Sequence, residues 1–238
     1  EGLFGMRGMQ GKIKEICELK SKFNFRLLVD DAHGFGTLGK TGAGAGEEQG
    51  CQDQIDVYFS TFAKSMAGFG AFIAGDADII RILKYNLRSQ VFAKSLTMPM
   101  VIGGLKRLEL LRSRPEIKAK LWENVNKLQN GLIERGFNIG GTDTCVTPVM
   151  MQGSTVEATL LVKDLRENYG IFTSVVIYPV IPKGMILLRL IPTASHTDAE
   201  INETLDAFDA IHDKLTSGFY KEQEQKLLEE KGLSFKST

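Results

Sequence analysis

The sequence is poor in cysteine, in net charge and in long apolar runs, and each shortage excludes a class of protein. Its three cysteines are far apart among 238 residues, so neither a disulfide framework nor a metal site is indicated. Lysine plus arginine equals aspartate plus glutamate at 29 each, which argues against a nucleic-acid partner. No apolar run approaches the roughly 18 residues of a membrane span. We therefore expect no metal, no nucleic acid, no membrane span and a reducing, cytoplasmic location.

The apolar patterns of the first half predict an α/β arrangement. Residues 11–23 carry apolar side chains at helical spacing with lysines opposite, which predicts an amphipathic helix. The apolar runs at 25–30, 55–61 and 71–75 are typical of strands buried in a parallel sheet, and 77–89 has the pattern of a helix. Strands that alternate with helices indicate a mainly parallel sheet.

The second half has a different pattern, which predicts a small α+β domain. Two long helices are expected after residue 96, followed by strand candidates at 145–151, 171–179 and 185–191 with helices between them. Residues 217–238 are polar and predict an exposed tail that is in part helical. We thus divide the chain into residues 1–95, 96–216 and 217–238.

The glycine-rich stretch DDAHGFGTLGKTGAGAG, residues 30–46, matches two nucleotide-binding patterns at once. A phosphate loop of either kind has to open a helix, whose first amides then face the phosphates. The glycines that alternate after Thr41 each cost about 1 kcal/mol in a helix relative to alanine. The dinucleotide pattern also needs its first glycine directly after the strand, whereas several residues precede Gly34. We therefore interpret neither match as a nucleotide site.

Polar side chains follow the first two predicted strands. Asp30 and His33 come at the end of one strand, and Thr61 and Lys64 at the end of the next. Ligands of open parallel sheets bind outside the carboxyl ends of the strands, so we expect these four residues to line one crevice. Taken singly, a strand-end aspartate can cap a turn and a lysine can be a solvated charge. The apolar surroundings of Lys64, STFAKSMAGFGAF, instead favour a nucleophilic amine suited to Schiff-base chemistry.

The segments VDDAHGFGTLGKTGAG and STFAKSMAGFGAFIAG together resemble the core of the α-oxoamine synthases. These are fold-type I pyridoxal-phosphate (PLP) enzymes that join an amino acid to an acyl-CoA with loss of carbon dioxide. The family's D-x-x-H motif matches Asp30 to His33, and its T-x-x-K motif matches Thr61 to Lys64. PVIPKGMILLRLIPTASHT, residues 179–197, resembles the C-terminal signature of the family. The resemblance covers about residues 1–215.

The resemblance implies a role for each matched residue. Asp30 would keep the cofactor's ring nitrogen protonated, which makes the ring an electron sink. His33 would bond the phenolic oxygen or the substrate, and Thr61 the cofactor phosphate. Lys64 would hold the cofactor covalently and act as the base at the substrate's α-carbon. Arg189 would clamp the substrate carboxylate, a task suited to a bidentate guanidinium; an arginine at a sheet edge that pairs with an aspartate remains the structural alternative.

The resemblance also implies a fold and an assembly. Residues 1–95 would form part of the cofactor-binding large domain of a fold-type I transferase, before a small C-terminal α+β domain. Family members are homodimers with shared active sites, so Ser95 would reach the phosphate of the neighbouring subunit. In the family, the phosphate loop and the residue that stacks on the cofactor ring lie upstream of the position where this sequence begins. The sequence starts with Glu1 rather than with an initiator methionine. We therefore expect a fragment that holds PLP poorly on its own and is an incomplete catalyst.

The sequence around these motifs is most similar to that of bacterial serine palmitoyltransferases, which implies synthesis of a sphingolipid base. 8-Amino-7-oxononanoate synthase, glycine C-acetyltransferase and an aminotransferase remain alternatives, and serine, alanine and glycine all remain open as substrates. A non-catalytic module that keeps the fold and the dimer surface is the alternative from another class. The presence of Asp30, His33, Thr61 and Lys64 together argues against it, because folding does not require all four.

Overall fold

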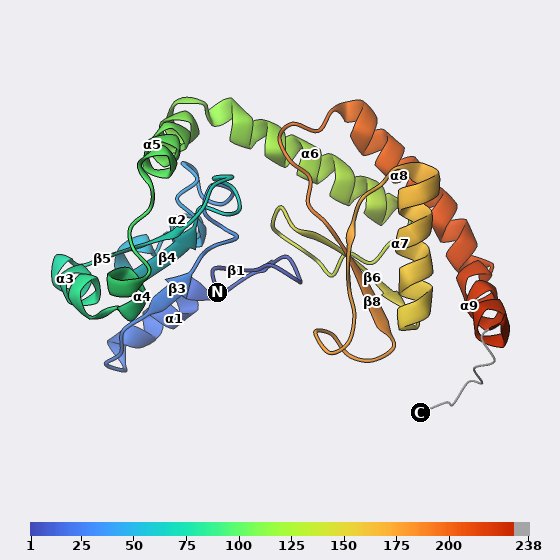
Figure 1. The fold of residues 1–238 in the computed structure, drawn as a ribbon, viewed down its shortest axis with the longest axis horizontal. Coiled ribbons are helices and arrows are strands. Elements are labelled where there is room, and N and C mark those ends of the chain that lie inside the picture. Colours follow the sequence, from blue (N-terminus) through green and yellow to red (C-terminus); the bar gives the residue numbers. More distant parts are fainter. Residues whose placement is uncertain (231–238) are drawn as a thin grey trace. The chain divides into compact units, whose positions relative to one another are not determined.

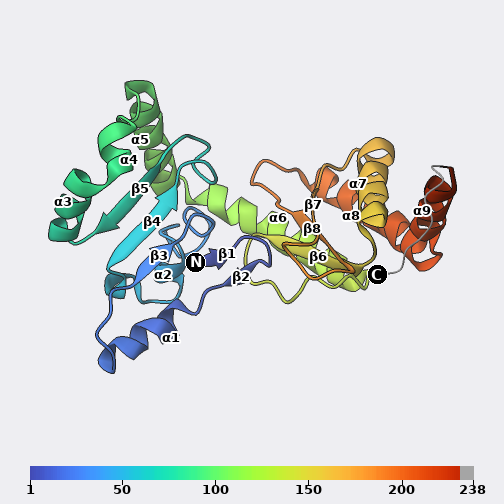
Figure 2. The same ribbon diagram turned by 60° about the horizontal axis from the view of Figure 1, so that its bottom comes forward.

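The computed structural model describes residues 1–230, and the chain divides after Lys120 into two compact units. Figures 1 and 2 show the elements of each unit in two orientations. In the described part of the chain, none of the helices is both long and apolar enough to cross a membrane. The division predicted at residue 95 rests on a change in the sequence pattern, and it stays a prediction.

The first unit contains two small sheets and a set of short helices. Its strands are β1 (Leu3–Phe4), β2 (Met9–Gln10), β3 (Leu28–Asp30), β4 (Val57–Thr61) and β5 (Ala71–Gly75). Its helices are α1 (Ile13–Glu18), α2 (Ala45–Glu48), α3 (Ala77–Asn86), α4 (Arg88–Phe92) and α5 (Met98–Ser113), with single 3₁₀ turns at Leu19–Ser21 and Gln52–Gln54.

The main sheet of this unit has the order β3-β4-β5. β3 runs parallel to β4, as predicted, whereas β5 runs antiparallel to β4. The reason is the connection: a parallel neighbour needs a crossover of about a dozen residues or more, and only the short loop at 62–70 joins β4 to β5. β1 and β2 form a separate antiparallel hairpin that the sequence analysis did not predict.

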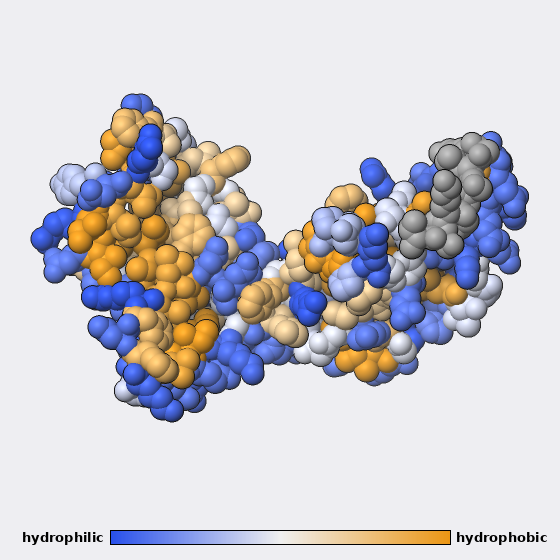
Figure 3. All heavy atoms as spheres, turned by 90° about the horizontal axis from the view of Figure 1, so that it is seen from below, coloured by the Kyte–Doolittle hydropathy of each residue, from blue (hydrophilic) through white to orange (hydrophobic). Residues whose placement is uncertain are grey.

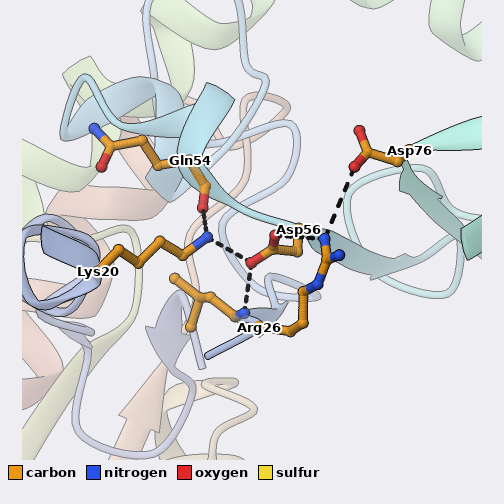
Figure 4. Close-up of polar contacts among 6 residues, drawn as sticks. Lys20, Arg26, Gln54, Asp56 and Asp76 are labelled. Atoms are coloured by element: carbon orange, nitrogen blue, oxygen red, sulfur yellow. Dashed lines mark hydrogen bonds and ion pairs between the residues drawn. The ribbon is translucent and has the colours of Figure 1, made fainter. Parts of the chain in front are cut away.

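An ion-pair cluster holds the amino-terminal ends of β3 and β4 together (Figure 4). One oxygen of Asp56 accepts hydrogen bonds from the Leu27 amide (2.7 Å) and from Lys20 Nζ (2.5 Å), and the other lies 3.2 Å from Arg26. The bond from the Leu27 amide, followed by the bond from Lys20, lowers the pKa of Asp56 to about 2. This cluster stabilises the first residues of β3 and β4, at the end of the sheet opposite to Asp30 and Thr61.

The first unit exposes much apolar surface (Figure 3). No residue of α3, α4 or α5 is buried. Large apolar side chains at least 61% exposed on these helices are Ile82, Tyr85, Phe92, Met98, Ile102 and Leu105. Since contiguous apolar patches on monomeric proteins mark interaction surfaces, this face is suited to contact with further protein.

The second unit is a three-stranded antiparallel sheet covered by helices. The sheet order is β6-β8-β7, and the core includes Leu132, Val149, Leu165, Leu188, Phe208 and Ile211. Its elements are α6 (Pro115–Glu134, which starts before the division), β6 (Thr147–Gln152), α7 (Thr155–Tyr169), β7 (Ser174–Val176), β8 (Met185–Leu190), α8 (Asp198–Thr216) and α9 (Phe219–Glu230).

The polar stretch predicted as a tail at 217–238 contains the packed helix α9, which corrects that expectation. Tyr220 is buried and donates a hydrogen bond of 2.5 Å to Asp164 on α7. Glu224 is also buried and accepts a bond of 2.7 Å from Ser154, the residue that caps α7. These two polar contacts thus attach α9, a helix with few apolar residues, to α7 and its cap. Residues 231–238 of the predicted tail lie outside the described residues.

Candidate active site

Asp30 and Thr61 lie on the same face of the main sheet, at its carboxyl end. Asp30 is the last residue of β3 and pairs with Phe59 on β4. Side chains alternate along a strand, so Phe59 and Thr61 share one half-buried face, while Tyr58 and Ser60 point to the buried face. The register therefore places the ends of β3 and β4 side by side, with Asp30 and Thr61 on one face.

Lys64 lies in the loop that joins β4 to β5. The Thr61 hydroxyl shapes the start of this loop, because it accepts a hydrogen bond from the Ala63 amide (3.1 Å) and donates to the Gly70 carbonyl (3.0 Å). Ala67 adopts a left-handed φ of 43°, a costly conformation for alanine that is common near functional sites. The Lys64 side chain is exposed, and its amine makes no hydrogen bond or ion pair within residues 1–230. It is available for reaction.

A hydrogen bond ties the Lys64 loop to the turn that carries His33. The Asp31 carbonyl accepts bonds from the amides of Gly34 and Phe35, which closes the turn after Asp30. The Ser65 hydroxyl then donates to the Phe35 carbonyl at 2.6 Å. Since Ser65 follows Lys64 directly, this bond holds the two predicted motifs next to each other.

The His33 ring lies directly against the backbone of the β1–β2 hairpin. A Cβ atom added at Gly5 would overlap the Nε2 end of the imidazole. Glycine at this position therefore leaves the space that the ring occupies. The first unit thus places Asp30 and Thr61 on one face of the sheet and links the Lys64 loop to the turn that carries His33. That the four side chains line one crevice stays a prediction.

Carboxylates of the glycine-rich loop and of the end of α2 organise this loop, which explains why it is no phosphate loop. Four of its amides donate to carboxylate oxygens: Gly39 to Glu48 (2.7 Å), Thr41 and Ala43 to Glu47 (3.0 and 3.1 Å), and Ala45 to Asp31 (2.8 Å). A phosphate loop presents such amides to its ligand. Here they are already occupied by negatively charged partners, and a phosphate would be repelled.

Arg189 lies in the second unit, on the central strand β8 rather than at a sheet edge. Its neighbours across the sheet are Pro148 on β6 and Ser174 on β7. Burial lowers the pKa of its guanidinium from the ordinary value. In the part of the chain that the structure describes, its buried Nε has no hydrogen-bond partner and no carboxylate pairs with it. The structural alternative, an edge arginine paired with an aspartate, does not describe this side chain.

Ser95 is exposed in the segment between α4 and α5, and among the described residues no hydrogen bond ties it to the four residues above. Within residues 1–230, no group of three or more histidine, cysteine, aspartate or glutamate side chains is arranged to hold a metal ion. The sequence analysis missed Asp31, a fully buried carboxyl between two predicted site residues. An acidic residue beside another acidic residue gives no sign of burial, so no sequence signal distinguished it.

The sequence of the chain is similar to those of PLP-dependent acyltransferases. The family model of aminotransferase class I and II matches residues 1–208. The cysteate-C-fatty acyltransferase of Capnocytophaga ochracea is 66% identical, over 98% of this chain and 55% of that protein. The serine palmitoyltransferase of Sphingobacterium spiritivorum is 36% identical, over 87% of this chain and 51% of that protein. The chain spans about half the length of the curated relatives it matches.

Solved structures confirm the predicted fold class. The serine palmitoyltransferase of Sphingomonas wittichii superposes with a TM-score of 0.83 at 28% identity, over 88% of this chain and 52% of the other. A serine palmitoyltransferase solved with PLP gives the same TM-score at 30% identity, over the same shares of the two chains. These relatives also confirm the predicted resemblance to the α-oxoamine synthases. The chain belongs to the aminotransferase class I and II family.

Proposed function

We propose that the full-length protein is a PLP-dependent C-acyltransferase, which condenses an amino acid with an acyl-CoA and releases carbon dioxide and free CoA. The observation that carries the proposal is the unpartnered amine of Lys64, held beside the turn of Asp30 and His33 at the end of two parallel strands. Because the chain spans about half the length of its relatives, the activity is proposed for a protein that includes the rest of that length.

The side chains present fit PLP, which when bound supplies an electron sink for negative charge at the substrate's α-carbon. The unpaired amine of Lys64 can hold the cofactor covalently, and the Asp30 carboxylate can hold the proton on the ring nitrogen. His33 can bond the phenolic oxygen. The hydroxyl of Thr61, once it releases the Gly70 carbonyl, or that of Ser95 from a second subunit, can donate to the phosphate. The bound PLP of a structural neighbour supports this assignment.

Two groups of this chain would act on the amino acid itself. The Lys64 amine, once released from the cofactor, can take the proton from the α-carbon and later return it. The Arg189 guanidinium can bind the carboxylate, for which its unpartnered Nε offers a donor. A buried donor without a partner is costly in a folded protein, and an anionic ligand would remove that cost.

For the amino acid we propose cysteate. The relative named for cysteate is 66% identical, whereas the relatives named for serine palmitoyltransferase and 8-amino-7-oxononanoate synthase are 33–36% identical. Serine, with sphingolipid base synthesis as the outcome, is the alternative. The homodimer and the cytoplasmic location also stay proposals. The exposed apolar face of α3, α4 and α5 supports contact of this unit with further protein.

The test is a substrate panel with the purified full-length protein. PLP and palmitoyl-CoA are supplied with cysteate, serine, alanine or glycine, and the release of the CoA thiol is followed. We expect the fastest release with cysteate, loss of turnover in Lys64→Ala, and normal turnover in Lys40→Ala, an exposed lysine of the same unit. Faster release with serine would overturn only the choice of cysteate. Equal turnover of Lys64→Ala and wild type would overturn the proposed function.

A further inference from the structure

Asp31 is the buried centre around which the glycine-rich loop folds. Its side chain has no exposed surface, although it lies between the half-buried residues Asp30 and His33. One carboxylate oxygen accepts hydrogen bonds from the Ala45 amide (2.8 Å) and from the Tyr58 hydroxyl (2.9 Å). These two bonds join the start of α2 and the strand β4 to the turn that follows β3.

Three glycines let the backbone approach this carboxyl group closely. A Cβ atom added at Gly2, Gly34 or Gly44 would overlap an oxygen of Asp31. The segments before β1, after β3 and before α2 therefore meet at one side chain. This contact accounts for glycine at two positions of the loop without any role in nucleotide binding.

Tyr58 extends the contact to the far side of the loop. Its hydroxyl lies 2.9 Å from Asp31 and 3.1 Å from the Ala43 carbonyl, and it has a single proton to donate. When Asp31 is ionised, the Tyr58 hydroxyl donates its hydrogen bond to the carboxylate. When Asp31 is neutral, its carboxyl O–H can donate to the Tyr58 oxygen, and the Tyr58 hydroxyl then donates to the Ala43 carbonyl. Burial raises the pKa of Asp31. The loop is held in either protonation state.

We propose that Asp31 is a positioning residue for the reaction, and this inference rests on the proposed function. Its backbone closes the turn between Asp30 and His33, since its carbonyl accepts the amides of Gly34 and Phe35 and its amide donates to Phe59 on β4. Its side chain fixes the same turn from the buried face of the sheet. Asp31 thereby sets where the Asp30 carboxylate and the His33 ring meet the cofactor, without touching it.

The test compares four variants of the full-length protein loaded with PLP. Asp31→Ala removes the acceptor, Asp31→Asn keeps one oxygen to accept both bonds, and Tyr58→Phe removes one donor. Asp53→Asn, an exposed acid of the same unit, is the matched control. The readouts are kcat, the KM for acyl-CoA, and the visible circular dichroism of the bound cofactor, which depends on how the ring is held.

We expect kcat to fall at least tenfold in Asp31→Ala and about threefold in Tyr58→Phe, with altered visible dichroism and an unchanged KM for acyl-CoA. Asp31→Asn should recover most of kcat, and Asp53→Asn should match wild type. A folded Asp31→Ala with normal dichroism and kcat would overturn the inference, as would an Asp31→Asn no better than Asp31→Ala.

If Asp31→Ala does not fold, Tyr58→Phe decides, and normal dichroism and kcat in that variant overturn the inference. A wild-type protein without lysine-bound cofactor absorbance would refute the proposed function itself. A normal wild-type spectrum with unaffected variants would refute only the role of Asp31.

Discussion

Asp30 on β3 pairs with Phe59 on β4, two residues before the end of that strand. The parallel register therefore brings the carboxylate of the first motif to the level at which the second motif begins. The β4–β5 loop then carries Lys64 back toward the same turn, where Ser65 bonds to Phe35. The proposed function requires that one small ring contact the acid and the amine together.

Replacement of Arg189 tests the proposed carboxylate contact. Arg189→Lys keeps a positive charge but loses the planar pair of donors. We expect the KM for the amino acid to rise and kcat/KM to fall about 10- to 100-fold, the usual size for loss of a charged contact. The KM for acyl-CoA should not change. Arg166→Lys, an exposed arginine of the same unit, is the control, and equal effects of both variants would refute the assignment.

The Asp56 cluster predicts how stability depends on pH. The pKa of Asp56 is lowered to about 2, so the ionised carboxylate stabilises the folded state above its ordinary pKa, and this contribution is lost as the pH falls toward 2. At neutral pH we expect Asp56→Asn to lower the free energy of unfolding by about 1–2 kcal/mol. Urea unfolding at pH 7 and pH 2.5 measures the difference, which should shrink at the lower pH. Asp78→Asn, an exposed acid, should change little at either pH.

The buried thiols of Cys17 and Cys51 predict that stability falls as the pH rises into the alkaline range, the opposite of the effect of Asp56. Burial and the hydrogen-bonded neighbour Cys17 raise the pKa of Cys51 to about 11. The unfolded chain would ionise this thiol first, so the free energy of unfolding should fall between about pH 9 and 11, by at most about 3 kcal/mol. Cys51→Ala should reduce that fall, as measured by urea unfolding at pH 8 and pH 10. An identical pH dependence in the variant would show that the thiol is solvated.

The end of α7 offers a clean test of backbone conformation. Gly170 ends this helix with a left-handed φ of 69°, and an added Cβ would meet no atom within 4 Å. Gly170→Ala should therefore lower the free energy of unfolding of the second unit by about 1 kcal/mol, through conformation alone. Gly170→Asn should cost less, because asparagine tolerates this region. Thermal unfolding of both variants gives the comparison, and an alanine variant as stable as wild type would contradict the reading.

Local patterns predicted most elements, and the misses have physical causes. The strand at 71–75 is found with the expected bounds, since glycines flank a short apolar run. The hairpin of β1 and β2 has strands of two residues each, which are too short for any periodicity. The helix α9 depends on buried polar contacts to residues more than fifty positions away, such as Tyr220 with Asp164, and no local pattern contains them.

The candidate site shows the same division between local and long-range information. The motif residues Asp30, His33, Thr61 and Lys64 could be predicted because strand ends and motif spacing are local. Asp31 could not, because its burial arises when Gly2, the loop at 30–46 and Tyr58 meet in space. The side chains that we propose to act on a ligand were thus visible in the sequence, whereas Asp31, which we propose to position them, was not.

Covalent attachment of the cofactor to Lys64 is the most direct test of the whole account. The full-length protein is loaded with PLP, reduced with borohydride and digested, and the modified peptide is identified by mass spectrometry. The account predicts a phosphopyridoxyl group on the peptide that contains Lys64, and no stable modification in Lys64→Ala. Modification of a different lysine, or PLP bound to the protein with no modified lysine, would contradict it.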